Sequence, residues 1–131
     1  MTQTRRPTVL IADDDGVTRS LLRLMLKDGD YDVIGEALDG EAAVEMCTRL
    51  KPDLVCLDVM MPKMDGYTAA QKIKAEVQPT PIARMLTAKG QEADVVRGIG
   101  GGADDHIIKP FSPRELVARI NVALIKAGRP A

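Results

Sequence analysis

Aromatic residues are scarce in this chain of 131 residues, which has two tyrosines, one phenylalanine and no tryptophan. The core must therefore be packed with aliphatic and small side chains, and the length suits one domain with a workable core. Cysteine is scarce too, because only Cys47 and Cys56 occur, in apolar surroundings and without the spacing of a metal site. We interpret both as reduced packing residues of a cytosolic protein.

The sequence also lacks long apolar runs and a strong excess of charge. No run approaches the roughly 20 apolar residues of a membrane-spanning helix, and the first residues lack the apolar segment of a secretory signal. The net charge of −1 argues against electrostatic binding to nucleic acid or to an anionic membrane. We therefore expect a cytoplasmic domain that binds neither nucleic acid nor membrane directly.

Apolar runs alternate with segments of helical periodicity along the chain. This alternation predicts an α/β fold, in which a parallel sheet carries helices on both faces. The predicted strands are Val9–Asp13, Asp32–Ala37, Leu54–Asp58, Ile82–Thr87 and His106–Lys109. The predicted helices are Gly16–Lys27, Glu41–Leu50, Tyr67–Val77, Gln91–Ile99 and Pro113–Lys126.

Four of the predicted strands end in polar residues that a phosphoryl-transfer site can use. Ligands of an open parallel sheet bind beyond the carboxyl ends of its strands. These strand ends are therefore expected to form one site from distant parts of the sequence. The residues are Asp13 with Asp14, then Asp58, Thr87 and Lys109.

The acidic residues predict a magnesium site. Asp13, Asp14 and Asp15 are consecutive, and crowded carboxylates repel one another unless they are protonated or neutralised by a cation. Together with Asp58 they offer the oxygen ligands that Mg²⁺ prefers. For Asp15 alone we favour a simpler role, as the cap of the following helix.

Three further side chains suit the chemistry of phosphoryl transfer. The Asp58 carboxylate can attack phosphorus to form an acyl phosphate, Lys109 can pair with it or with the phosphoryl group, and Thr87 can donate its hydroxyl. Taken singly, each also has an ordinary reading, as a turn aspartate, a solvated lysine or a β-branched strand residue. His106, the only histidine, is either a conformational reporter or an exposed ring, and it forms no catalytic triad.

In their joint order and spacing these residues resemble the receiver domain of two-component response regulators. The resemblance runs from Val9 to about Ala127 and implies a doubly wound sheet of flavodoxin-like strand order 2-1-3-4-5. Its motifs are Asp13-Asp14, Asp58 followed by Met61-Pro62-Lys63-Met64-Asp65-Gly66, Leu86-Thr87-Ala88 and Lys109-Pro110-Phe111.

The resemblance implies a phosphorylation switch rather than a classical enzyme. Asp58 would accept a phosphoryl group from a sensor histidine kinase or a phosphotransfer protein, and Lys109 would contact that group. Mg²⁺ would be held by Asp13, Asp14, Asp58 and the backbone carbonyl of Met60.

The resemblance also implies a switch pair, Thr87 and His106. This pair would reshape the face made by Gln91–Ile99, His106–Lys109 and Pro113–Lys126, which would then bind a partner or a second copy of the chain. An ordinary solvated face is the alternative. Candidates for charged contacts on that face are Arg97, Asp104, Asp105 and Arg119.

Two positions depart from the pattern of the family. His106 stands where an aromatic Tyr or Phe is usual, which would make switching sensitive to pH, because histidine titrates near pH ~6.5. Arg84 lies in an otherwise apolar strand, and the stretch from Pro81 to Thr87 is one residue longer than usual. We expect a β-bulge, or an Arg84 side chain that extends to solvent, to accommodate it.

An enzyme is the competing hypothesis. Val9–Val17 also resembles the nucleophile strand of haloacid dehalogenase-like phosphatases, with Asp13 as nucleophile. However, Asp104 and Asp105 precede a strand where that family's acidic pair follows one, and Asp58 would have no role. We favour a single receiver domain over residues 1–131, with its core at about 8–127 and a tail or the start of a linker to an output domain at 128–131.

Overall fold

The strands form one parallel five-stranded sheet in the order β2-β1-β3-β4-β5. The computed structural model describes residues 6–88, 105–109 and 113–126. This topology confirms the predicted doubly wound α/β fold and its strand order. The strands are β1 (Thr8–Ala12), β2 (Asp32–Ala37), β3 (Leu54–Asp58), β4 (Ile82–Ala88) and β5 (Asp105–Lys109).

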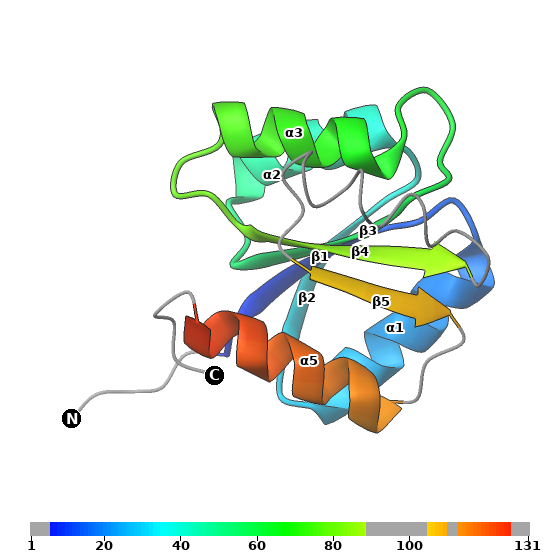
Figure 1. Cartoon of the computed structure of the whole chain (residues 1–131), viewed down its shortest axis with the longest axis vertical. Coiled ribbons are helices and arrows are strands. Elements are labelled where there is room, and N and C mark those ends of the chain that lie inside the picture. The colour runs from blue at the N-terminus through cyan, green and yellow to red at the C-terminus, as the bar shows by residue number, and fades with distance from the viewer. Residues whose placement is uncertain (1–5, 89–104, 110–112, 127–131) are drawn as a thin grey trace.

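Helices cover both faces of the sheet, with α2 and α3 on one face and α1 and α5 on the other (Figure 1). Every described boundary lies within one residue of its prediction, whereas the predicted helix Gln91–Ile99 lies outside the described residues. Among the residues described, no helix has the length and apolar character needed to cross a membrane. The helices are α1 (Gly16–Asp28), α2 (Gly40–Leu50), α3 (Gly66–Glu76) and α5 (Pro113–Lys126).

Aspartate side chains cap the first three helices. Asp15 accepts a hydrogen bond from the Val17 amide at the start of α1, which confirms its predicted capping role. Asp39 and Asp65 accept in the same way at the starts of α2 and α3. Because a cap satisfies an amide that has no partner inside the helix, these aspartates fix where each helix begins.

The core is divided into two apolar layers by the sheet. Leu10, Val55 and Met85 belong to the layer under α2 and α3, whereas Val9 and Ile11 belong to the layer under α1 and α5. Strands β1 and β3 are buried on both faces, as continuous apolar strands of a parallel sheet usually are. The edge where these two strands end is therefore rigidly supported.

The two cysteines are free, buried and in opposite layers of the core. Burial raises the pKa of Cys47 to about 12. Burial also raises the pKa of Cys56 to about 12, although the positive charge of Arg84 acts in the opposite direction. A thiol of such high pKa is not reactive at neutral pH, which confirms the predicted packing role.

The prediction for Arg84 was wrong, because the residue is fully buried, with 0% of its surface exposed. The β3–β4 and β4–β5 registers run without a shift, and the irregularity of the sheet lies in the β1–β2 pairing instead, between Val9 and Leu10. Neither the predicted bulge at Arg84 nor its extension to solvent occurs. Strand alternation directs Arg84 to the same layer as Ile82 and Leu86, which is the layer under α1 and α5.

The charge of Arg84 influences that layer directly. Burial raises the pKa of Tyr31 to about 12, and Arg84 opposes that rise, so the guanidinium lies close enough to interact with the phenol. The Tyr31 hydroxyl in turn donates a hydrogen bond to the side-chain oxygen of Asn121 in α5. A hydrogen bond therefore links the residue just before β2 to α5, in the layer that also holds Arg84.

Candidate functional site

Three carboxylates meet at the carboxyl ends of β1 and β3. The two strands are neighbours, with Ala12 paired to Leu57, so the residues that follow them lie side by side. One carboxylate oxygen from each of Asp13, Asp14 and Asp58 lies within 4.8 Å of the others. Asp13 is 1% exposed, Asp58 is half-buried and Asp14 is exposed. The structure thus brings together the three acids that the sequence predicted.

Asp13 is fixed through its backbone and its side chain. Its amide donates to the carbonyl of Ala37 at 3.1 Å, which extends the β1–β2 pairing by one residue. Its carboxylate accepts the Asp15 amide at 2.9 Å. The loop between β1 and α1 is therefore held in one conformation where it carries the acidic pair.

The loop between β3 and α3 turns tightly behind Asp58. The Val59 amide donates to the carbonyl oxygen of Leu86 at 3.2 Å, and the Gly66 amide donates to the carbonyl oxygen of Val59 at 3.0 Å. A β-carbon added to Gly66 would lie 2.3 Å from the carbonyl oxygen of Asp58. Only glycine permits so close an approach, and this contact fixes the backbone carbonyl of Asp58, the residue whose side chain joins the cluster.

The ends of β4 and β5 continue the same edge of the sheet. Thr87 pairs with Ile108, and Lys109, the last residue of β5, pairs with Ala88. His106 lies near the start of β5, beside Met85. The structure describes the backbone of these residues, and the side chains of Thr87, His106 and Lys109 lie outside what it describes.

Of the predicted interface residues, the structure describes the backbone of two. Asp105 begins β5 and pairs with Arg84, and Arg119 belongs to α5. Their side chains, together with Arg97 and Asp104, lie outside the described part of the chain.

The carboxylates suit a hard divalent cation. Carboxylates this close repel one another unless a cation or a proton intervenes, and Mg²⁺ is bound in proteins by such oxygens while it keeps several waters. The exposure of Asp14 leaves the cluster open on one side. The residues present therefore fit the predicted Mg²⁺.

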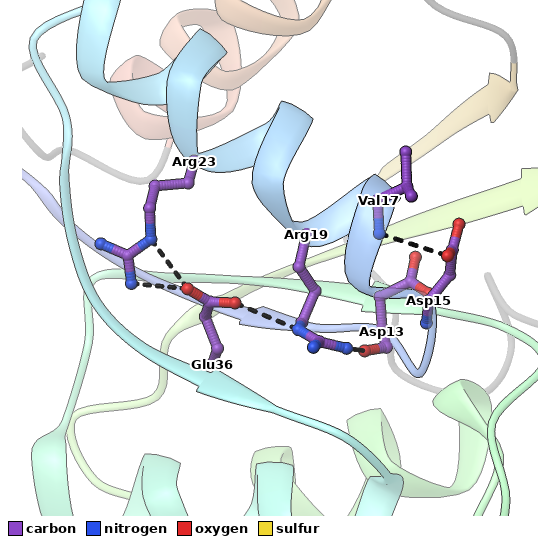
Figure 2. Close-up of polar contacts among 6 residues, drawn as sticks. All are labelled: Asp13, Asp15, Val17, Arg19, Arg23 and Glu36. Atoms are coloured by element: carbon purple, nitrogen blue, oxygen red, sulfur yellow. Dashed lines mark hydrogen bonds and ion pairs between the residues drawn. The ribbon is translucent and has the colours of Figure 1, made fainter.

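Sequence reasoning missed a cluster of charged residues beside these acids (Figure 2). Arg19 of α1 donates to the carbonyl oxygen of Asp13 at 2.8 Å and to Glu36 of β2 at 3.1 Å. Arg23 donates to the same glutamate at 2.7 Å. The one available signal was the spacing of the two arginines, which places them on one face of the helix.

Comparisons with a family model and with curated proteins indicate the same family. A family model described as the response regulator receiver domain matches residues 9–121. The transcriptional regulatory protein ResD of Bacillus subtilis is 43% identical over 129 residues, which cover 98% of this chain and 52% of ResD. The DNA-binding dual master transcriptional regulator RpaA of a Synechocystis strain is 39% identical over 124 residues, which cover 94% of this chain and 51% of RpaA. The chain thus spans about half the length of these relatives.

Solved structures agree with this result. The receiver domain of the Francisella response regulator 1452 superposes with a TM-score of 0.83 at 28% identity, over 93% of this chain and 99% of that one. The receiver domain of AraT, a response regulator from Geobacillus stearothermophilus, gives a TM-score of 0.79 at 31% identity, over 94% and 98%. These matches do not support the alternative of a haloacid dehalogenase-like phosphatase with Asp13 as nucleophile.

Proposed function

The chain belongs to the response regulator receiver domain family, the phosphorylation-activated signalling modules of two-component systems, and from this premise we propose that Asp58 is its phosphorylated residue. A sensor histidine kinase or a phosphotransfer protein supplies the phosphoryl group. The observation that carries the proposal is the position of Asp58, which ends the buried strand β3 within 4.8 Å of the Asp13 and Asp14 carboxylates.

In this proposal a carboxylate oxygen of Asp58 attacks phosphorus, the bond from phosphorus to the donor breaks, and an aspartyl phosphate forms. Asp13, Asp14, Asp58 and the Met60 carbonyl hold Mg²⁺, which when bound neutralises the negative charge of the phosphoryl oxygens. Asp13 is the rigid member of this set, because its amide and its carboxylate are both engaged.

Thr87 and Lys109 complete the proposed site from the neighbouring strand ends. Lys109 pairs with the phosphoryl group, and Thr87 donates its hydroxyl to a phosphoryl oxygen. The parallel pairing of β4 with β5 supports these roles, since both strands end at the edge where Asp58 lies. Neither residue makes the domain a classical enzyme, because the chain itself is the acceptor.

The signal is proposed to spread through Thr87 and His106. The new dianion biases an equilibrium between two conformations of the face that contains β5 and α5. That face then binds a partner or a second copy of the chain, with Arg97, Asp104, Asp105 and Arg119 as candidate contacts. The names of ResD and RpaA support transcription control as the output of a longer protein, in which one receiver domain has its core at about 8–127.

Treatment with a small phosphodonor and Mg²⁺ is expected to add one phosphoryl group to the protein, because the carboxylate cluster needs a cation to admit a phosphoryl dianion. Mass spectrometry of the intact protein measures the addition. The same reaction in the presence of a chelator is the control, and equal labelling with and without Mg²⁺ would contradict the proposed metal dependence.

Replacement of Asp14 by asparagine is expected to weaken Mg²⁺ binding by about tenfold or more, because the charge of the ligands sets affinity. The protein should not be destabilised, since the residue is exposed and loss of one charge relieves the repulsion within the cluster. Calorimetric titration with Mg²⁺ and urea unfolding measure the two effects. Asp32→Asn is the matched control, because Asp32 is an exposed aspartate at the start of β2, at the other end of the sheet from the acidic cluster. Equal Mg²⁺ affinity in Asp14→Asn and this control would refute the role of Asp14.

A further inference from the structure

The side chain of Arg19 joins a backbone carbonyl to a side-chain carboxylate beside the proposed cation site. Its Nη1 donates to the carbonyl oxygen of Asp13 at 2.8 Å, and its Nε donates to Oε1 of Glu36 at 3.1 Å. The Arg19 side chain is only 19% exposed. A guanidinium held by two acceptors in a partly buried position has little freedom to move.

Glu36 is the acid that anchors this guanidinium. Arg23, one turn further along α1, reaches Oε2 of Glu36 through Nε at 2.7 Å and through Nη2 at 2.7 Å. The hydrogen bond from Arg23 is the largest cause that lowers the pKa of Glu36 below its ordinary value, and Arg19 lowers it further. Glu36 is therefore ionised at neutral pH, and each carboxylate oxygen has an arginine partner.

The carbonyl that Arg19 contacts belongs to the peptide group between Asp13 and Asp14. A peptide group is planar, so a hydrogen bond to its oxygen restricts the orientation of both residues. The other side of Asp13 is already fixed by its amide hydrogen bond to Ala37. Arg19 thus holds the one peptide that connects two of the proposed Mg²⁺ ligands.

We propose that Arg19 is a positioning residue of the cation site. Arg19 fixes the Asp13–Asp14 peptide, while Glu36 keeps the Arg19 guanidinium away from the acidic cluster. The inference rests on the proposed Mg²⁺ site and adds a residue that does not touch the cation. Loss of a group that orients metal ligands in this way typically costs roughly 10- to 100-fold in metal affinity or activity.

A positioning role and a simple charge effect predict opposite changes in Mg²⁺ affinity when Arg19 is removed. A positive charge close to a cation site repels the cation, so removal of Arg19 would tighten Mg²⁺ binding if charge were its main effect. If Arg19 positions the ligands, its removal loosens the acidic pair and weakens binding. The direction of the change therefore separates the two.

The test compares Arg19→Met with Arg23→Met by calorimetric titration with Mg²⁺. Both changes remove one guanidinium from Glu36, yet Figure 2 shows Arg23 on the far side of Glu36 from Asp13. We expect Arg19→Met to weaken Mg²⁺ binding by about tenfold and Arg23→Met to change it by less than about twofold. Urea unfolding in chelator, monitored by circular dichroism, reports stability separately from affinity.

Equal or tighter Mg²⁺ binding by Arg19→Met would overturn the inference, and so would equal losses in the two variants. If Arg19→Met does not fold, Arg19→Lys replaces it. An ammonium replaces one of the two contacts but lacks the planar fork that makes both, so weaker binding than in the parent supports positioning, and parent-like or tighter binding overturns it. Failure of the parent protein to bind Mg²⁺ would instead refute the proposed function.

Discussion

Replacement of Asp58 by asparagine is expected to abolish phosphorylation by a small phosphodonor in the presence of Mg²⁺. The substitution keeps the size of the side chain but removes the carboxylate, and a neutral amide oxygen is a poor nucleophile toward phosphorus. Intact-protein mass spectrometry should show the label in the parent and none in the variant. No other expected change in activity is as large, because the acceptor itself is lost.

The fold should survive this substitution. Asp58 is half-buried at the end of β3, and loss of one charge relieves the repulsion among three neighbouring carboxylates. Asp30→Asn is a suitable control, since Asp30 has a positive φ of 68°, which asparagine tolerates well. Label that persists in Asp58→Asn, or that is lost equally in the control, would contradict the assignment of Asp58.

The sequence predicted the strands and their ends well because the signals are local. A run such as Leu54–Leu57 is apolar throughout and stops at an acid, so both its burial and its boundary can be read from neighbouring residues. Once the parallel topology is known, the meeting of Asp13 with Asp58 follows from geometry. The acidic cluster was therefore predictable to the level of individual residues.

Arg84 and Arg19 were beyond the reach of the same reasoning. A lone arginine in an apolar strand normally extends to solvent, and only the packing of α1 and α5 over the sheet leaves Arg84 at 0% exposure. Arg19 looks like an ordinary surface residue of a helix, and its contacts depend on where α1 lies relative to the ends of β1 and β2. Such contacts are set by tertiary placement, which no local pattern encodes.

Replacement of Gly66 by alanine is expected to destabilise the fold by about 3 kcal/mol. The new β-carbon would lie 2.3 Å from the carbonyl oxygen of Asp58 and 2.6 Å from Cε of Met85. The methionine side chain can move aside, but the carbonyl belongs to the strand that carries the proposed phosphorylation site. Urea unfolding monitored by circular dichroism measures the loss, because the chain has no tryptophan.

Gly16→Ala provides the matched control for this prediction. A β-carbon at Gly16 would lie 3.4 Å from Nη2 of Arg19, which is an ordinary van der Waals contact, and alanine is favoured over glycine in a helix by up to about 1 kcal/mol. The control should therefore be neutral or stabilising. Similar stabilities of the two variants would show that the β3–α3 loop can move away from Asp58. A destabilised Gly66→Ala that is also phosphorylated slowly while still folded would link the close approach of this loop to the position of the acceptor carboxylate.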